Sequence, residues 1–216
     1  FAHSTWENCV YKDCLFEKAN LGGMEITDCE FHDCSFPETI FSETIFKNCR
    51  FERCKFNHIM IESPQFTECS IVDSEYAGAM ILEGAFRDVS IEGSSFERLT
   101  VRGGNWRNVD IFESSIFMSM WIELNMVKTN FRECRLHRIL FQRDCVLEQI
   151  DFSSSTLRLV NASGLNLSSS VFQRTYGELC DFSESVITNS VWIDVKLESC
   201  RFAYAVMTDS EFNAVQ

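Results

Sequence analysis

The 216-residue sequence is poor in residues that interrupt a fold, with only two prolines and nine glycines. No stretch rich in proline, glycine and serine separates two segments, so we predict a single domain over residues 1–216. No apolar run approaches the roughly 20 residues of a membrane-spanning helix, and no signal-peptide pattern stands at the N-terminus. The sequence begins with Phe1 and not with Met, which favours a fragment or a processed form of a longer protein.

Positive charge is also scarce. Nineteen Lys and Arg face 32 Asp and Glu, which gives a formal net charge of −13. Because affinity for nucleic acid phosphates comes from Lys and Arg, this balance argues against direct binding of DNA or RNA. An acidic surface instead attracts a basic partner, or occupies a protein surface that normally holds DNA.

Motifs that carry catalytic or metal-binding chemistry are missing as well. The histidines, His3, His32, His58 and His137, form no H-E-x-x-H pair, and we expect them to be surface side chains. The segment VRGGNW (101–106) lacks the spacing and the lysine of a phosphate-binding loop, and no G-x-S-x-G elbow is present. We therefore predict a protein that is not an enzyme, with no catalytic residue, no cofactor and no metal site.

What the sequence does contain is an apolar residue at every fifth position. In steps of five from Phe1, all 29 positions up to Phe141 are apolar or aromatic. The phase slips by one residue within 142–146, and 14 further centres run from Leu147 to Phe212. A period of five fits neither a helix nor a simple strand. It suits a chain that turns a corner every five residues, so that four sides make a 20-residue coil and stacked coils pair as parallel strands.

The repeated unit resembles that of the pentapeptide-repeat family, in which a small residue, a polar residue and Leu or Phe are followed by two polar residues. The segments CRFER (49–53), CKFNH (54–58), ANLGG (19–23) and CRFAY (200–204) fit this unit. The resemblance implies an all-β fold, a right-handed quadrilateral parallel β-helix. About eleven coils would stack into a rod on the order of 50 Å long.

All eleven cysteines lie two residues before a core centre, where the family places a second small residue that points inward. Zinc ligation is the competing interpretation, but a rigid ladder does not offer four tetrahedral ligands. Disulfides between stacked cysteines are within reach, although their parallel Cβ directions make them awkward. After the slip, Cys145, Cys180 and Cys200 shift with the core, as packing requires. We predict free, buried thiols in a reducing compartment such as the bacterial cytoplasm, with a secreted effector as the alternative.

Residues 20 positions apart share one column of such a rod. One column is apolar between residues 40 and 140, and an apolar stripe in water typically marks an interface. Cover by neighbouring long side chains or by a terminal segment is the alternative. The predicted interface, for a protein partner or for self-association, comprises Ile40, Met60, Met80, Leu82, Phe112, Phe117, Met118, Met120, Ile122 and Leu140.

The columns on the opposite side hold half of the 32 acidic residues but only six Lys and Arg, and so carry most of the net negative charge. The predicted acidic face comprises Asp13, Asp28, Glu30, Asp33, Glu52, Glu68, Asp73, Asp88, Glu92, Asp110, Glu113 and Glu133. A solvated face that keeps the rod soluble is the simpler interpretation. A face that mimics DNA is the more specific one.

Two functions follow from these surfaces. The first is a non-catalytic scaffold, an acidic rod that binds a protein partner. The second rests on the resemblance, because the family includes DNA-mimicking proteins that bind type II topoisomerases such as gyrase and protect them from quinolones. Those relatives commonly carry a C-terminal helical segment and projecting loops, and this sequence shows neither. We rank the scaffold first.

Overall fold

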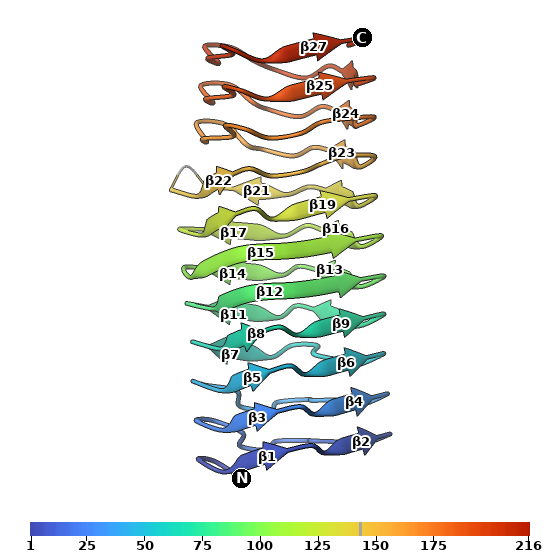
Figure 1. The fold of residues 1–216 in the computed structure, drawn as a ribbon, viewed down its shortest axis with the longest axis vertical. Helices are drawn as coiled ribbons and strands as arrows, with labels where there is room; N and C mark the ends of the chain where they lie inside the picture. The colour runs from blue at the N-terminus through green and yellow to red at the C-terminus, as the bar shows by residue number, and fades with distance from the viewer. Residues whose placement is uncertain (143) are drawn as a thin grey trace.

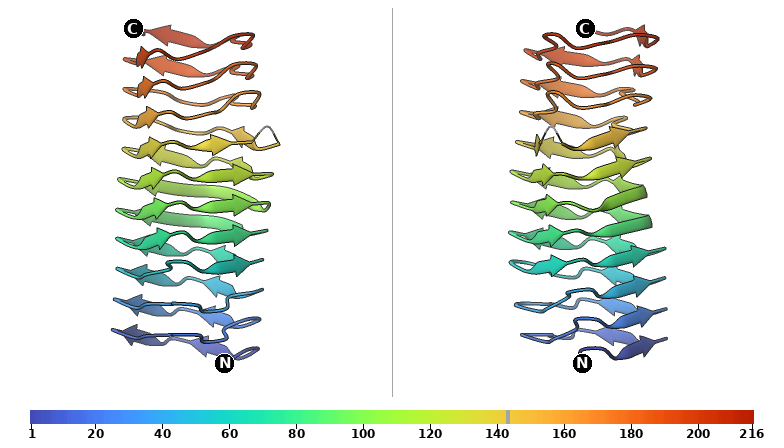
Figure 2. Two further views of the ribbon diagram at one scale, coloured as in Figure 1. Left: turned by 180° about the vertical axis from the view of Figure 1, so that it is seen from behind. Right: turned by 90° about the vertical axis from the view of Figure 1, so that its left-hand side faces the viewer.

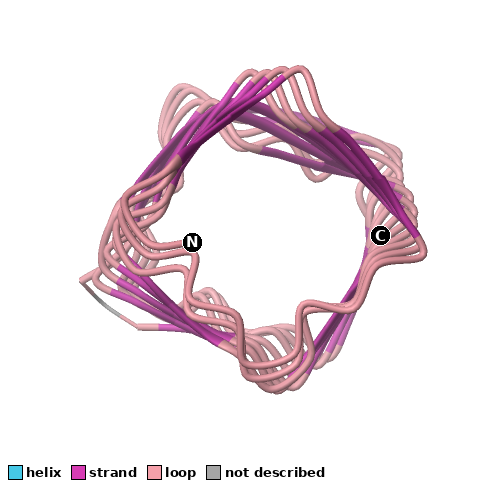
Figure 3. Cartoon of the chain, turned by 90° about the horizontal axis from the view of Figure 1, so that it is seen from below, coloured by secondary structure: helices cyan, strands magenta, loops and turns pink. Residues whose placement is uncertain are grey.

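The described chain is a stack of similar coils made of short parallel strands. The computed structural model describes residues 1–142 and 144–216, and this part of the chain contains no helix, hence none that could span a membrane. The chain climbs from the N- to the C-terminus as stacked coils (Figures 1 and 2), and each coil is four-sided when viewed along the stack (Figure 3). The predicted all-β quadrilateral β-helix is confirmed, and the 216 residues make between ten and eleven coils.

The strands fall on four sides, which we call A to D in chain order. Side A carries β7 (Met60–Glu62), β11 (Met80–Leu82), β14 (Thr100–Arg102), β17 (Met120–Ile122) and β21 (Leu140–Phe141). Side B carries β1 (Thr5–Glu7), β3 (Glu25–Thr27), β5 (Ile45–Lys47), β8 (Gln65–Thr67), β18 (Asn125–Val127) and β22 (Val146–Glu148). Side C carries β2 (Val10–Lys12), β4 (Glu30–His32), β6 (Arg50–Glu52), β9 (Ser70–Val72), β19 (Asn130–Arg132), β25 (Val191–Ile193) and β27 (Glu211–Asn213).

Side D completes the coil. It carries β10 (Glu75–Ala77), β13 (Ser95–Glu97), β16 (Ser115–Phe117), β20 (Arg135–His137), β23 (Thr156–Arg158), β24 (Tyr176–Glu178) and β26 (Lys196–Glu198). Two longer strands, β12 (Ala85–Glu92) and β15 (Asn105–Phe112), run across sides B and C without a break.

Backbone hydrogen bonds join each coil to the next. On side C, Phe31 pairs with Phe51 in register, 20 residues further on. Between the coils that bracket residues 142–146 the offset is 21: Asn125↔Val146, Asn130↔Asp151, Arg135↔Thr156 and Leu140↔Asn161. One extra residue is thus accommodated where the sequence slips, and Arg143, within that stretch, lies outside the described residues.

The corners share one backbone conformation. In the described chain, the residue two positions after each core centre has a positive φ, as at Asn48 (50°), Arg53 (51°) and His58 (56°). L-residues enter this left-handed region at a cost of about 1–2 kcal/mol, and β-branched residues fit it worst. No Val, Ile or Thr occupies any of these corner positions.

The core is filled by the centres and by the residues two positions before them. Aromatic rings stack from coil to coil at the coil spacing: Phe31 lies 4.9 Å from Phe51, and Phe36 lies 4.8 Å from Phe56. Rings on neighbouring sides meet edge to face, as Phe51 and Phe56 do at 68°. Such stacked and edge-to-face arrangements suit the aromatic quadrupole.

All eleven cysteines are free thiols that point into this core, and eight of them are buried. The other three, Cys9, Cys14 and Cys200, are only half-buried, because they lie in the first two or last two coils, where fewer neighbouring coils cover them. The prediction of buried thiols is therefore wrong for these three. Each of these three thiols donates a hydrogen bond to the carbonyl oxygen two residues earlier, as Cys14 Sγ does to the Lys12 oxygen at 3.3 Å.

The buried thiols make stability depend on alkaline pH. Burial raises the pKa of Cys54, Cys134 and Cys180 to about 12, whereas an unfolded thiol titrates near 8.5. Above pH of about 8.5 the unfolded chain releases protons that the folded chain keeps, so the free energy of unfolding falls as the pH rises. The slope is at most about 1.4 kcal/mol per pH unit for each such thiol.

We expect Cys54→Ala with Cys134→Ala to flatten this slope in urea unfolding measured between pH 8 and 10. Each variant is compared with the natural protein at every pH, so the cavity cost cancels from the slope. A slope that stays the same would show that these thiols ionise equally in both states.

A second prediction concerns Gly104, whose φ is +95° and whose backbone lies against the preceding coil. A Cβ at this position would stand 2.1 Å from the Gly84 carbonyl oxygen, which must then shift. We expect Gly104→Ala to lower the free energy of unfolding by more than about 1 kcal/mol, by strain and steric overlap. Gly22→Ala is the control, because its Cβ would meet nothing closer than 3.1 Å; equal losses in both variants would contradict the argument.

Candidate functional site

The predicted apolar stripe forms a continuous line only on side A. Met60, Met80, Thr100, Met120 and Leu140 follow one another strand by strand in register along β7, β11, β14, β17 and β21. Ile40 lies one coil below Met60. The exposed fractions are 47% for Ile40, 58% for Met60, 39% for Met80 and 38% for Met120, and Leu140 is half-buried.

The other residues of the predicted interface do not all lie on side A. Leu82 and Ile122 lie half-buried on the other edge of side A, with Arg102 between them. Met118 lies on the corner between sides D and A, 3.9 Å from the Arg138 guanidinium. The predicted interface includes two residues that do not join the stripe.

Those two residues are phenylalanines on other sides of the coil. Phe112 ends β15 on side C, opposite the stripe, and is half-buried there. Phe117 ends β16 on side D, with its ring 5.1 Å from that of His137. A shift of 5 residues moves a side chain around one corner, so neither residue can share a flat contact surface with Met80.

Other exposed apolar residues lie outside the predicted interface, among them Val10, Leu15 and Ile45 below the slip and several residues above it. Leu159 and Leu179 continue the corner column of Met118, and Val186 and Val206 lie on side B. The sequence predicts the positions of these four residues when columns of residues 20 apart are counted in the phase that begins at Leu147. The stripe itself ends at Asn161, which bridges to Leu140.

The predicted acidic face lies on side C and its two corners. Asp28, Glu68 and Asp88 occupy the corner with side B; Glu30, Glu52, Glu92 and Asp110 lie on side C; and Asp13, Asp33, Asp73, Glu113 and Glu133 occupy the corner with side D. The twelve carboxylates are thus brought together along one side of the rod. Part of their charge is neutralised locally.

Arginines neutralise the lower half of this face. Arg53 donates two hydrogen bonds to Asp33 (2.7 and 2.8 Å) and also contacts Glu52, which Arg50 approaches at 3.2 Å. The Arg53 guanidinium lowers the pKa of Asp33, and with Arg50 it lowers the pKa of Glu52. His32, expected to be a surface side chain, is half-buried between the carboxylates of Glu30 and Glu52, at 2.8 and 3.3 Å.

The rest of the face has one further arginine pair, between Arg132 and Asp110 at 2.6 Å. Glu92 on side C and Glu113 and Glu133 at the corner with side D are exposed, and among residues 1–142 and 144–216 no cation forms an ion pair with them. The same holds in the lower half for Asp13, Asp28, Glu68 and Asp73, so unpaired carboxylates run along the whole face.

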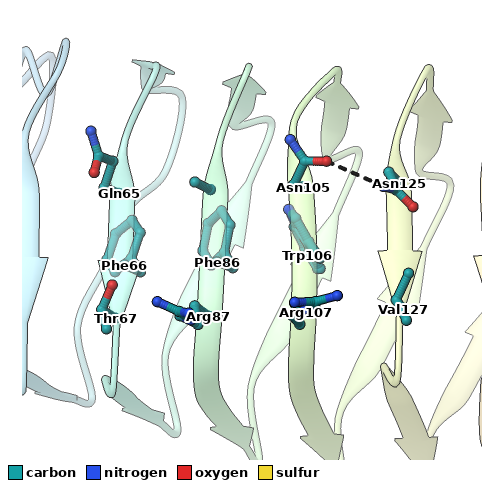
Figure 4. Close-up of a pocket in the computed structure, with 11 residues that line it drawn as sticks. Gln65, Phe66, Thr67, Phe86, Arg87, Asn105, Trp106, Arg107, Asn125 and Val127 are labelled. Carbon is teal, nitrogen blue, oxygen red and sulfur yellow. Dashed lines mark hydrogen bonds between the residues drawn. The ribbon is translucent and has the colours of Figure 1, made fainter.

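Side B carries a trough that the sequence analysis did not identify. The trough has a volume of about 420 Å³ and crosses four coils, over β8, β12, β15 and β18. Figure 4 shows two rows of side chains along it. One row is Gln65, Ala85, Asn105 and Asn125, and the other is Thr67, Arg87, Arg107 and Val127. The missed signal was the absence of any acid in these two columns between Ile45 and Val127, on an otherwise acidic rod.

No group of three or more His, Cys, Asp or Glu side chains that could hold a metal ion is found among the described residues.

The comparisons with known proteins agree with this geometry. A family model described as "Pentapeptide repeat region" matches residues 24–106. No curated protein matches the chain by sequence. Among solved structures, full-length QnrB1, described as a plasmid-mediated fluoroquinolone resistance protein, is similar with a TM-score of 0.59 and 9% identity, covering 94% of this chain and 93% of that one.

HetL, a pentapeptide-repeat protein involved in heterocyst differentiation regulation in the cyanobacterium Nostoc sp. strain PCC 7120, has a TM-score of 0.53 and 11% identity. The match covers 98% of this chain and 88% of HetL. At these identities the likeness concerns the fold. The family match shows that residues 24–106 are a pentapeptide-repeat region, and the same five-residue unit runs from Phe1 to Phe212.

Proposed function

We propose that this protein is a non-catalytic, protein-binding rod whose partner packs on the side A stripe. The observation that carries the proposal is the run of Ile40, Met60 and Met80 on three successive coils, each between 39% and 58% exposed. Isolated exposed apolar residues need no explanation, but a contiguous line does.

The chemistry of the stripe suits a contact surface. Methionine side chains are flexible and polarisable, so they adapt to the shape of a partner. The strands beneath them are held in register by the coils, so the backbone under the contact is preorganised and little ordering entropy is lost. The same surface serves a heterologous partner or a second copy of the chain.

The test of this proposal is Met80→Lys with Met120→Lys. The two positions are separated by Thr100, so the new lysines do not face each other directly. We expect the variant to keep the natural unfolding midpoint, because both side chains point outward, and to lose self-association or partner capture by at least about tenfold, because two charges would be desolvated in the contact. Light scattering and pull-down experiments measure the two readouts.

The matched control is Ser90→Lys with Asn130→Lys on side C. These residues hold the same strand position, two coils apart, and add the same charge. A natural protein that is monomeric and captures no partner, or a control as defective as the stripe variant, would remove the basis of the proposal.

The second candidate function is binding to a type II topoisomerase, and a specific observation favours it. Glu92 on side C and Glu113 and Glu133 at the neighbouring corner present carboxylates without ion-pair partners along one side of a rod, which is the arrangement a DNA-binding groove would accept. The similarity of the fold to that of QnrB1, a fluoroquinolone resistance protein, also supports this candidate. This function would place the protein in the bacterial cytoplasm.

A DNA gyrase supercoiling assay with and without a fluoroquinolone tests this candidate. We expect the natural protein at micromolar concentration to restore supercoiling in the presence of the drug, and Glu92→Gln, Glu113→Gln and Glu133→Gln combined to reduce this protection at least severalfold, by loss of charge complementarity. Neither binding nor protection by the natural protein would end this candidate and leave the side A proposal untouched.

A further inference from the structure

We propose that the side B trough binds a short acidic peptide segment of a protein partner, in an extended conformation along the rod axis. This site is separate from the side A stripe and does not depend on it. Three features of the trough carry the assignment: its uncompensated positive charge, its unused amide groups and its length.

The charge comes from Arg87 and Arg107, which lie directly opposite each other in the β12–β15 register. Like charges at directly opposed positions are destabilising in a sheet, so their placement calls for a compensating anion. The nearest carboxylate to Arg87 is Asp88, at 3.9 Å from Nε, and Asn108 already donates to that carboxylate at 2.6 Å. Within the described part of the chain, Arg107 has no carboxylate partner.

The two rows themselves are favourable for an anion, although the corners that flank them carry Glu83 and Glu123 on one edge and Glu68 and Asp88 on the other, and the rod as a whole carries −13. The two rows of the trough contain no acidic residue between Ile45 and Val127, and Lys47 extends the basic row one coil beyond Thr67. Arginine forks bind carboxylates through paired, charge-assisted hydrogen bonds. The trough is therefore a local site of positive charge on an acidic molecule.

The amide row distinguishes a peptide from a simple oxyanion. Asn125 Nδ2 donates to Asn105 Oδ1 at 3.2 Å, which leaves the Asn105 amide hydrogens as donors and the Asn125 oxygen as an acceptor. Peptide backbone presents one acceptor and one donor per residue, and so uses both groups. A fully ionised oxyanion such as sulfate only accepts hydrogen bonds and would leave the Asn125 oxygen unused.

The length of the trough fits a short strand. From Gln65 to Asn125 there are three coil steps, about 14 Å at the usual strand spacing. At about 3.3 Å per residue this distance accommodates four or five extended residues. Figure 4 shows the arginines on one row and the asparagine amides on the other. The side chains of both rows are exposed along this distance, except that Thr67 and Val127 are half-buried.

The experiment is isothermal titration calorimetry with a five-residue peptide of alternating glutamate and serine, blocked at both ends. We expect the natural protein to bind it and Arg87→Gln with Arg107→Gln to weaken binding at least about tenfold, since both charge-assisted contacts to the peptide carboxylates would be lost. Rising NaCl concentration should weaken the natural complex and leave the variant's residual binding nearly unchanged.

The matched control is Arg98→Gln with Arg135→Gln, which removes the same charge from side D and its corner. It should bind the peptide as the natural protein does. Asn105→Asp, which places a carboxylate in the trough, should also weaken binding, and its circular dichroism should match that of the natural protein.

Four outcomes would overturn the assignment. They are no binding at millimolar peptide, equal weakening by the control variant, equal binding of a peptide with glutamine in place of glutamate, and inorganic phosphate that binds as tightly as the peptide. The last result would show a simple anion site with no role for the amide row.

Discussion

Backbone hydrogen bonds between successive coils are the constraint on which the rest of this molecule depends. They fix the coil spacing, and the aromatic rings then stack at that spacing, as Phe31 and Phe51 do at 4.9 Å. In the described chain they also make each corner repeat the one below, so that the residue two positions after a core centre has a positive φ. Surface residues 20 apart in sequence consequently become neighbours in space, so each outward column behaves as a separate chemical surface.

The core and the coil could be predicted from the sequence because one period controls both. Every centre from Phe1 to Phe141 is apolar, and the cysteines keep step with the centres across the slip. The corner conformation has a weaker effect on the sequence. β-branched residues are absent from corner positions such as Asn48 and Arg53, but this pattern can be recognised only after the corners have been located. Gly104 has a positive φ although it is not a corner residue. The five-residue pattern does not predict this conformation, because it arises from the close approach of the Gly104 backbone to Gly84.

The surfaces could be predicted only as columns. Side chains that reach from one column to another decide how much charge each column carries. Arg53 forms ion pairs with Asp33 and Glu52, whereas Glu113 forms none within the described part of the chain. Phe112 is predicted on a side next to the apolar stripe, but it lies on the opposite side of the coil. The Arg87–Arg107 pair has no counterpart in the overall composition, because a net charge of −13 conceals a local basic pair. Three sides thus differ in chemistry: apolar on A, basic and amide-bearing on B, and acidic on C.

The seven methionines allow the central claim, that coil geometry creates a contact stripe on side A, to be measured directly. With 13C-labelled methionine methyl groups and a soluble paramagnetic relaxation agent, the signals of Met60, Met80, Met118 and Met120 should broaden strongly, while those of buried Met24 and Met126 should not. In the self-associated or partner-bound state, Met60, Met80 and Met120 should become protected. Broadening of Met24 or Met126 would contradict the coil register, and stripe methyls that stay accessible in the complex would contradict the interface.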